Sequence, residues 1–178
     1  MMLLSKTILH IRPMRMEDIE QVQAVDHLSF SMPWPASAYR YELKENPQSF
    51  LWVAEILTPD EQWQIVGVIV VWMILDEAHI ASIAVSPEQR GKGIGKQLLA
   101  GALKEAIQRG KRVATLEVRA HNFSAQNLYQ SFNFEVVGRR PRYYRDNNED
   151  ALIMTLKNLD SKYLDWLESE AWAGDQNS

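Results

Sequence analysis

The segment Arg90-Gly91-Lys92-Gly93-Ile94-Gly95 combines three glycines with cationic side chains. Glycine lets a backbone approach a ligand closely and leaves its amides unobstructed. A buried strand is expected before this segment and a helix after it, so the free N–H groups and the positive dipole end of the helix would face the loop. Lys96 would add a further positive charge. The segment therefore indicates a binding site for a small anion.

The glycine spacing does not fit two familiar phosphate-binding motifs. No Lys-Ser or Lys-Thr pair ends the segment as it would in a P-loop. The dinucleotide pattern G-x-G-x-x-G also fails, because its third glycine position holds Lys96 when counted from Gly91 and Leu98 when counted from Gly93. On the glycines alone, a tight strand-to-helix turn with solvated lysines remains an alternative.

Glu117 and Tyr129 are the side chains after this loop that could move a proton. Glu117 is expected on one strand face with Thr115 and Arg119, so a half-exposed Glu–Arg pair is the simpler interpretation of its spacing. Tyr129 falls on the apolar side of a helix, where core packing alone would explain it. Spacing alone leaves both chemical assignments open.

Strand-like runs and helical spacing alternate along the chain and predict an α/β fold. The expected helices are 16–28, 36–44 and 93–109, with another that Asn122 or Ser124 caps. The expected strands are 8–12, 49–57, 63–75, 79–85 and 112–120, with a closing antiparallel pair at 134–139 and 150–156. A last helix is expected at 161–172, inside an acidic C-terminal tail over 158–178 that follows a single domain over 1–157.

Charge is unevenly distributed along this chain of net charge −4. The stretch 88–112 holds seven basic residues against two acidic ones, and 139–145 holds four arginines and no acid. A mildly acidic chain with one concentrated basic stretch is not typical of a general nucleic-acid binder. We therefore expect a local site for an anionic ligand and no direct nucleic-acid contact.

Composition excludes several other classes of site. The chain has no cysteine, so disulfides, thiolate metal sites and a cysteine nucleophile are ruled out. Its four histidines lie far apart with no metal-ligand spacing, and we interpret His79 and His121 as structural. The longest apolar run, 65–75, is too short to span a bilayer, and residues 1–6 lack the apolar core of a secretion signal. A cytoplasmic location is expected.

A longer set of motifs resembles the GNAT acetyltransferases. Arg90-x-x-Gly93-x-Gly95 after Ile83-Ala84-Val85 is similar to the coenzyme A-binding motif of that family, and Ala125-x-x-Leu128-Tyr129-x-x-Phe132-x-Phe134 resembles the second half of its core. Four details resemble one branch, the ribosomal-protein-alanine N-acetyltransferases of the RimI type. These details are Phe30-Ser31-Met32-Pro33-Trp34, Asp76-Glu77-Ala78, Glu117-Val118-Arg119-x-x-Asn122, and Tyr143-Tyr144 before Glu149-Asp150-Ala151-x-x-Met154. The resemblance covers roughly residues 8–156.

The resemblance implies an acetyl-CoA site and no metal. The amides of 91–96 would hold the pyrophosphate, and the end of the strand at 83–85 would bond the pantetheine arm, with Asn122 on the other side. The implied coenzyme-binding residues are Ile83, Ala84, Val85, Arg90, Gly91, Lys92, Gly93, Ile94, Gly95, Lys96 and Asn122. The implied fold is a central mixed, mostly antiparallel sheet flanked by helices and splayed between its fourth and fifth strands.

The resemblance also implies roles for the reacting side chains. Glu117 would accept the proton of the attacking amine through water, and Tyr129 would place its hydroxyl at the coenzyme sulfur. A tyrosine with a pKa of about 10 stays protonated beside a thiol with a pKa of about 8.5, and can donate to it. Candidates for the substrate wall are Met32, Pro33, Trp34, Tyr143 and Tyr144, although packing of loops on the core would also explain them.

Three functions follow from these patterns. The first is acetylation of the N-terminal α-amino group of a protein, a small-subunit ribosomal protein beginning with alanine. The second is acetylation of another protein terminus, a lysine or a small-molecule amine, and the third is a non-catalytic coenzyme A sensor. The presence of both Glu117 and Tyr129 argues against the third. We expect a monomer or weak dimer that binds the N-terminal segment of its substrate protein.

Overall fold

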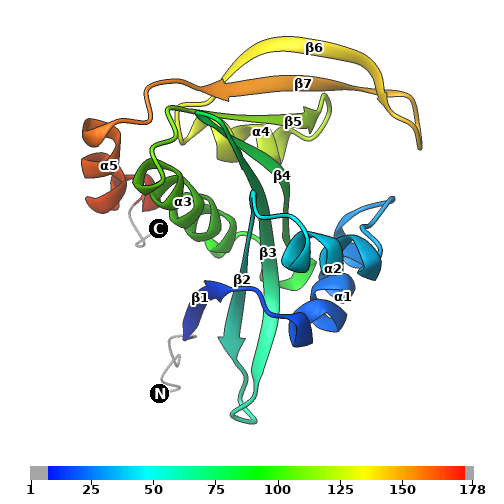
Figure 1. Cartoon of the computed structure of the whole chain (residues 1–178). Helices are drawn as coiled ribbons and strands as arrows, with labels where there is room; N and C mark the ends of the chain where they lie inside the picture. Colours follow the sequence, from blue (N-terminus) through cyan, green and yellow to red (C-terminus); the bar gives the residue numbers. More distant parts are fainter. Residues whose placement is uncertain (1–7, 175–178) are drawn as a thin grey trace.

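Seven strands form one sheet in the computed structural model, which describes residues 8–174 (Figure 1). Their order across the sheet is β1-β2-β3-β4-β5-β7-β6. The strands are β1 (Leu9–Pro13), β2 (Ser49–Leu57), β3 (Trp63–Ile74), β4 (Glu77–Val85), β5 (Val113–Arg119), β6 (Glu135–Tyr144) and β7 (Glu149–Leu156). The mixed, mostly antiparallel sheet expected from the sequence is confirmed.

The sheet divides between β4 and β5. These two strands are the parallel pair, and their pairing runs from Glu77–Val113 to Ile80–Leu116. Beyond that point β4 continues to Val85 and β5 to Arg119 without pairing to each other, while β5 stays paired with β7 along its other edge. Figure 1 shows the two strands diverging. The splay expected between the fourth and fifth strands is therefore present, and it leaves one edge of β4 without a strand neighbour.

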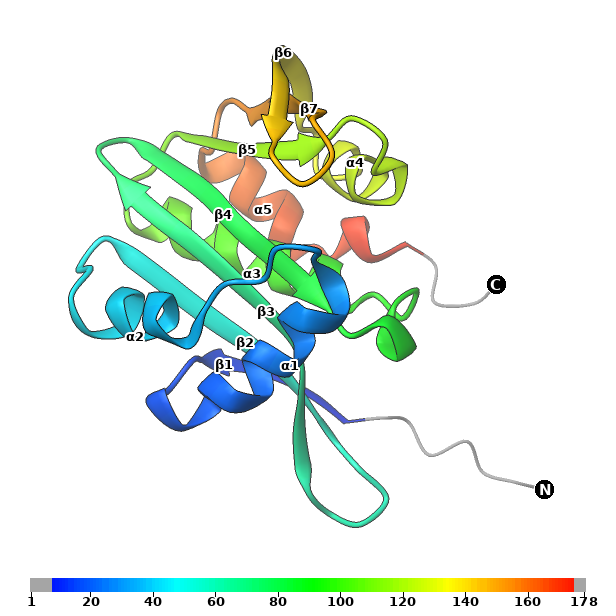
Figure 2. The same cartoon turned by 90° about the vertical axis from the view of Figure 1, so that its right-hand side faces the viewer.

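Helices cover both faces of the sheet (Figures 1 and 2). α1 (Ile19–Ser29) and α2 (Ala36–Lys44) pack on one face around a buried cluster that includes Val22, Tyr39 and Val68. α3 (Ile94–Gln108), α4 (Phe123–Gln130) and α5 (Ser161–Glu168) pack on the other face around Leu98, Phe132 and Leu167. Short 3₁₀ helices precede α1, precede α3 and follow α5. Within residues 8–174, no helix is both long and apolar enough to cross a membrane.

Close contact between α3 and β2 requires a glycine. A Cβ atom at Gly101 would lie 2.6 Å from Cζ3 of Trp52, which is closer than real Cβ contacts. The buried face of α3, which includes Leu98, Leu99 and Leu103, lies on the same side of the sheet. This packing fixes the position of α3, and therefore the loop at its N-terminus, relative to β4.

The predicted elements agree closely with the structure except at the last hairpin and the last helix, since α5 ends at Glu168 rather than at 172. Strand β6 runs on to Tyr144, so the expected end of this strand near 139 was wrong. β6 is an edge strand whose residues are almost all exposed, and its register shifts twice, at Val136/Gly138 and Arg140/Tyr144. An edge strand exposed on both faces lacks the apolar alternation by which strands are recognised. Tyr143 and Tyr144 therefore lie on a strand.

The C-terminal segment, defined here as residues 158–174, packs against the rest of the chain. Leu159, Leu167 and Trp172 belong to the same buried cluster as α3 and α4. The Tyr163 hydroxyl donates to the carbonyl oxygen of Phe132 at 2.7 Å. These contacts lead us to expect that the segment contributes to the stability of the domain.

We expect Leu167→Ala to lower the free energy of unfolding by about 2–4 kcal/mol, because the side chain is fully buried and its loss leaves a cavity. Leu164→Ala, in the same helix at a half-buried position, is the control and should cost about 1 kcal/mol. Urea unfolding followed by circular dichroism measures both. A loss below about 0.5 kcal/mol for Leu167→Ala would show that the segment is an independent appendage.

Candidate active site

The loop between β4 and α3 presents unpaired backbone amides. Gly91 and Gly93 have φ angles of 75° and 80°, a left-handed conformation that favours glycine. Gly93 is the N-cap of α3, no side chain among the described residues caps it, and Gln97 makes the first helical bond to its carbonyl at 3.0 Å. The N–H groups of residues 94–96 therefore have no acceptor within the helix. A Cβ at either glycine would meet nothing within 4 Å, so the backbone here is open to a ligand.

The end of β4 offers a second set of donors. Ser86 donates its N–H to Val66 in β3 at 2.8 Å. Because inward and outward bonding alternate along an antiparallel pair, the N–H groups of Ile83 and Val85 point away from β3, towards the gap next to β5. The Ala84 side chain is buried on the α1 side, and by the same alternation its main-chain N–H points to β3, so Ala84 offers no donor to the gap. These outward amides suit the bonding of an extended ligand arm.

The cations of the loop each have a defined position. Arg90 Nε donates to the carbonyl of Val85 at 2.9 Å, which ties the loop to the end of β4. Lys92 Nζ contacts Gln89 Oε1 at 2.8 Å, and Lys96 Nζ donates to the carbonyl of Trp172 at 3.3 Å. Free amides with three cations match the charge and shape of a pyrophosphate, so the residues present fit coenzyme A.

Asn122 serves as the N-cap of α4. Its Oδ1 accepts from the N–H of Ala125 at 3.1 Å, which is the capping role predicted for it or Ser124. The side-chain amide nitrogen is not needed for capping and could donate to a ligand from the β5 side of the gap. Asn122 is exposed, so nothing in the fold prevents this second contact.

Glu117 lies on the part of β5 that has left β4, and its carboxylate is between the side chains of His79 and Arg140. Its Oε2 is 3.2 Å from His79 Nε2, its Oε1 is 3.4 Å from an Arg140 nitrogen, and 13% of its side chain is exposed. The simpler interpretation of the spacing, a pair with Arg119, was wrong. Arg119 turns instead to Asp146 at 2.8 Å, because the hairpin turn beyond β6 covers the end of β5.

An aromatic row leads from the α1–α2 loop to Glu117. His79 stacks on Trp72 with ring centroids 5.5 Å apart, and Trp72 stacks on Trp34 at 6.3 Å. Trp72 Nε1 donates to Glu42 at 3.1 Å, which fixes the middle ring. Trp34 is half-buried against this row, whereas Met32 is 60% exposed at the tip of the same loop. The predicted wall residues Met32, Pro33 and Trp34 thus share one loop, but only Trp34 joins the row.

Tyr129 is 5% exposed and its hydroxyl makes no hydrogen bond within residues 8–174. Burial, and secondarily the nearby Tyr144, raise its pKa above the ordinary value. The ring packs on Phe134 at 5.8 Å, so it also belongs to the core, as the spacing indicated. Burial likewise raises the pKa of Tyr144 to about 12, and Glu117 contributes to this rise. Both tyrosines therefore stay protonated at neutral pH and can donate.

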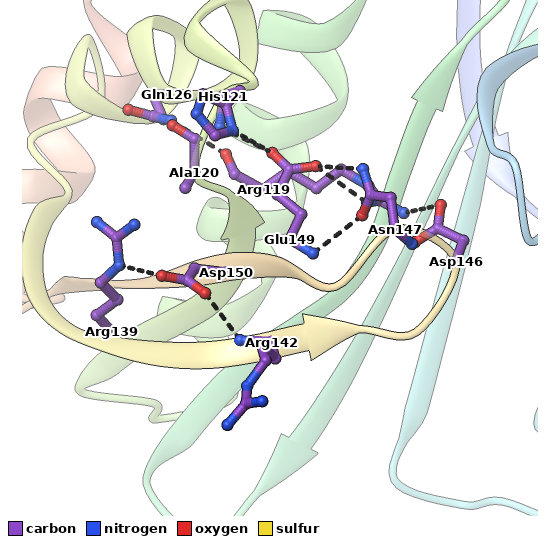
Figure 3. A network of polar contacts seen from close by, with 10 residues as sticks. All are labelled: Arg119, Ala120, His121, Gln126, Arg139, Arg142, Asp146, Asn147, Glu149 and Asp150. Carbon is purple, nitrogen blue, oxygen red and sulfur yellow. Dashed lines mark hydrogen bonds and ion pairs between the residues drawn. The ribbon is translucent and has the colours of Figure 1, made fainter.

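A polar network joins the hairpin turn to the rest of the site (Figure 3). The Arg119 guanidinium contacts Asp146 and Glu149 and lies 4.0 Å from the Tyr144 ring centre. The pKa of Glu149 is lowered to about 2, chiefly because its carboxylate accepts a hydrogen bond from the main-chain N–H of His121. Asp146 also accepts from the Ser31 hydroxyl. The α1–α2 loop, which carries Met32, Pro33 and Trp34, therefore contacts the β6–β7 turn that follows Tyr144.

Sequence reasoning missed three residues of this site: His79, Trp72 and Arg140. His79 was interpreted as structural, but it lies next to Glu117 because β4 and β5 pair in parallel with His79 opposite Thr115. Had the register of the expected neighbouring strands been considered, it could have placed His79 beside Glu117. Trp72 and Arg140 reach the site only through the register of β3 and the bulged edge strand, which no local pattern shows.

The fold and this geometry define a class of enzyme. The sequence profile described as Acetyltransferase (GNAT) family matches residues 19–134, and the chain belongs to this family. It is accordingly an acetyltransferase that uses acetyl-CoA as the acetyl donor.

Comparison with known proteins adds more particular likenesses. A Bacillus subtilis protein assigned by name as a ribosomal protein bS18-alanine N-acetyltransferase is 38% identical over 149 residues, which are 84% of this chain and 95% of that protein. The crystal structure of the Escherichia coli ribosomal-protein-S18-alanine N-acetyltransferase superposes with a TM-score of 0.74 at 26% identity, covering 85% of this chain and 94% of that one. A chain of the NatC complex, crystallised with Gag peptide and CoA, gives 0.73 at 25% identity, covering 84% and 98%.

We expect Gly93→Ala to weaken acetyl-CoA binding at least tenfold, about 1.4 kcal/mol. A Cβ at a φ of 80° is strained, so the loop will shift and move its amides away from the phosphates. Gly110→Ala is the matched control, because it has a φ of 75°, has equally open surroundings and lies just beyond the far end of α3. Calorimetry measures both affinities and thermal unfolding compares both stabilities. Equal affinities for the two folded variants would contradict the assignment of the loop.

Proposed function

We propose that this enzyme acetylates the N-terminal α-amino group of a ribosomal protein that begins with alanine. The observation that carries the proposal is the likeness to the bS18-alanine N-acetyltransferases, which spans nearly the full length of the Bacillus subtilis relative. The proposed acceptor is the N-terminal segment of a small-subunit ribosomal protein, and the reaction would take place in the cytoplasm. The site residues support this proposal, because Glu117 could accept a proton, Tyr129 could donate one, and aromatic side chains near Glu117 could hold a peptide.

The coenzyme would lie along the divided part of the sheet. The amides of 94–96 would hold its pyrophosphate, and the outward N–H groups of Ile83 and Val85, with Asn122 opposite, would bond the arm. Acetyl-CoA supplies the acetyl group as a thioester. The N–H of Val85 is the donor best placed to stabilise negative charge on the carbonyl oxygen during transfer.

Glu117 would accept the proton that the attacking amine releases, through a water molecule. His79 holds one carboxylate oxygen at 3.2 Å and Arg140 holds the other at 3.4 Å, so both oxygens have a fixed direction. Such a carboxylate is a modest base, which suits an amine already near its pKa. His79, which reaches solvent through its partly exposed ring, is the natural next carrier of that proton.

Tyr129 would donate its hydroxyl proton to the sulfur as the carbon–sulfur bond breaks. Its pKa is raised by burial, so the hydroxyl remains protonated across the physiological range. The hydroxyl is not committed to any partner within residues 8–174, whereas Tyr39 and Tyr163 have theirs bonded to Asp26 and Phe132. A buried ring whose hydroxyl has no structural partner among the described residues fits a catalytic role better than core packing alone.

The acceptor is inferred from the pKa values of amines. An α-amino group has a pKa of about 7.7–8.0 and a lysine side chain about 10.4, so at neutral pH the terminal amine is neutral a few hundred times more often. A single glutamate acting through water suffices for the first and serves the second poorly. The aromatic row on one side and Tyr143 and Tyr144 on the other would enclose an extended peptide end.

We expect Tyr129→Phe to lower kcat about 100-fold or more, within the usual range for loss of general acid catalysis. The Kd for acetyl-CoA should stay nearly unchanged, because the ring and its packing remain. Tyr163→Phe is the control, since it loses a real hydrogen bond of 2.7 Å outside the gap and should change kcat less than threefold. If Tyr129→Phe loses only stability and keeps normal turnover per folded molecule, Tyr129 is a core residue alone.

We expect rapid acetylation of a peptide that begins with a free alanine and none of the same peptide with a blocked N-terminus and an internal lysine. The reason is the difference of about 2.4 or more pKa units between the two amines. Mass spectrometry of both peptides after incubation with enzyme and acetyl-CoA measures the rates. Comparable rates on the two peptides would replace the proposal with acetylation of lysine.

A further inference from the structure

The C-terminal segment reaches the loop that would bind the coenzyme. After α5, the chain forms a short 3₁₀ helix, Ala171–Ala173, that contacts α3. Figures 1 and 2 show this red segment close to α5 and α3. The segment contacts the first turn of α3, directly after the loop, through a main-chain atom: the carbonyl of Trp172 accepts from Lys96 Nζ at 3.3 Å.

Trp172 is anchored on two sides, so the position of its carbonyl is well defined. The side chain is 5% exposed and its ring lies 5.5 Å from that of Phe132, just beyond the end of α4. Its indole N–H donates to the carbonyl of Leu167 in α5 at 2.8 Å. The ring therefore joins α5 to α4, and the main chain of residue 172 has little freedom beside α3.

Lys96 could contribute to the anion site with both its main-chain N–H and its side-chain ammonium. Its N–H is one of the three at the start of α3 without an acceptor in the helix. Its ammonium has three protons and no acceptor atoms, so one bond to Trp172 leaves two protons for a ligand. The partner is a neutral carbonyl, which orients the ammonium without cancelling its charge.

We propose that the C-terminal segment is part of the coenzyme site, with Trp172 as a positioning residue that holds Lys96 ready to bind the coenzyme phosphates. This inference rests on the proposed assignment of 91–96 to acetyl-CoA. A free lysine loses rotamer freedom when it binds a phosphate, whereas Lys96 has already lost it to the Trp172 carbonyl. Such preorganisation raises affinity without adding a contact to the ligand. The segment therefore increases affinity for the coenzyme and leaves the chemical step alone.

A double-mutant cycle on the full chain tests this coupling. Acetyl-CoA affinity is measured by calorimetry, without an acceptor, for the wild type, Trp172→Ala, Lys96→Met and the double variant. We expect Trp172→Ala to weaken binding three- to tenfold and Lys96→Met at least as much. The double variant should bind as Lys96→Met does, because the tryptophan acts through the lysine. The value of kcat at saturating acetyl-CoA should change less than twofold for Trp172→Ala.

Trp166→Ala is the matched control, because its ring packs on the same Phe132 at 5.8 Å from the same segment. It should lower stability yet leave the acetyl-CoA Kd unchanged. Trp172→Phe should recover most of the affinity, and Trp172→Leu replaces the alanine variant if that one does not fold. Additive losses in the cycle, tighter binding by Trp172→Ala, or equal effects of the two tryptophans would overturn the inference. A wild type that does not bind acetyl-CoA would instead refute the proposed function.

Discussion

The parallel pairing of β4 and β5 stops at Ile80 and Leu116, and the rest of the site depends on that limit. A main-chain N–H without a partner strand must find another acceptor, and the end of β4 offers its outward amides to whatever fills the gap. The same divergence frees the edge of β5 that faces β4 at Glu117, whose carboxylate lies next to His79 of β4 and Arg140 of β6. One interruption of hydrogen bonding thus provides both the donors and the carboxylate on which the proposed acetyl transfer depends.

Charge is arranged in two compartments around this gap. At one end, α3 begins with a left-handed glycine, free amides and cations, which together attract phosphate. At the other end, carboxylates are almost all paired: Glu117 with His79 and Arg140, and Asp146 and Glu149 with Arg119. The pairing keeps carboxylate charge from repelling the anionic coenzyme, and it fixes the directions of the groups around the acceptor.

The two helical layers fix the positions of these two charged regions relative to each other. On one face, α1 and α2 frame the loop whose Trp34 begins the aromatic row to His79. On the other face, the glycine loop precedes α3 and α4 carries Tyr129. The C-terminal segment contacts Phe132, just after α4, and Lys96 in α3. Because α1 and α3 pack on opposite faces of β3 and β4, both helical layers fix the position of the strand that borders the gap.

The sequence by itself determined the elements and the residues whose chemistry is local. The glycine loop, the strand before it, the cap at Asn122 and the apolar stripe with Tyr129 depend on neighbours within a few positions, so periodicity and spacing predicted them. Only the tertiary structure decided the partners of Glu117, because His79, Arg140 and Arg119 meet or miss it through strand register. The edge strand β6 and the contact of Trp172 with Lys96 were equally out of reach. They join residues far apart in the chain, and such pairings follow from how layers pack rather than from any local pattern.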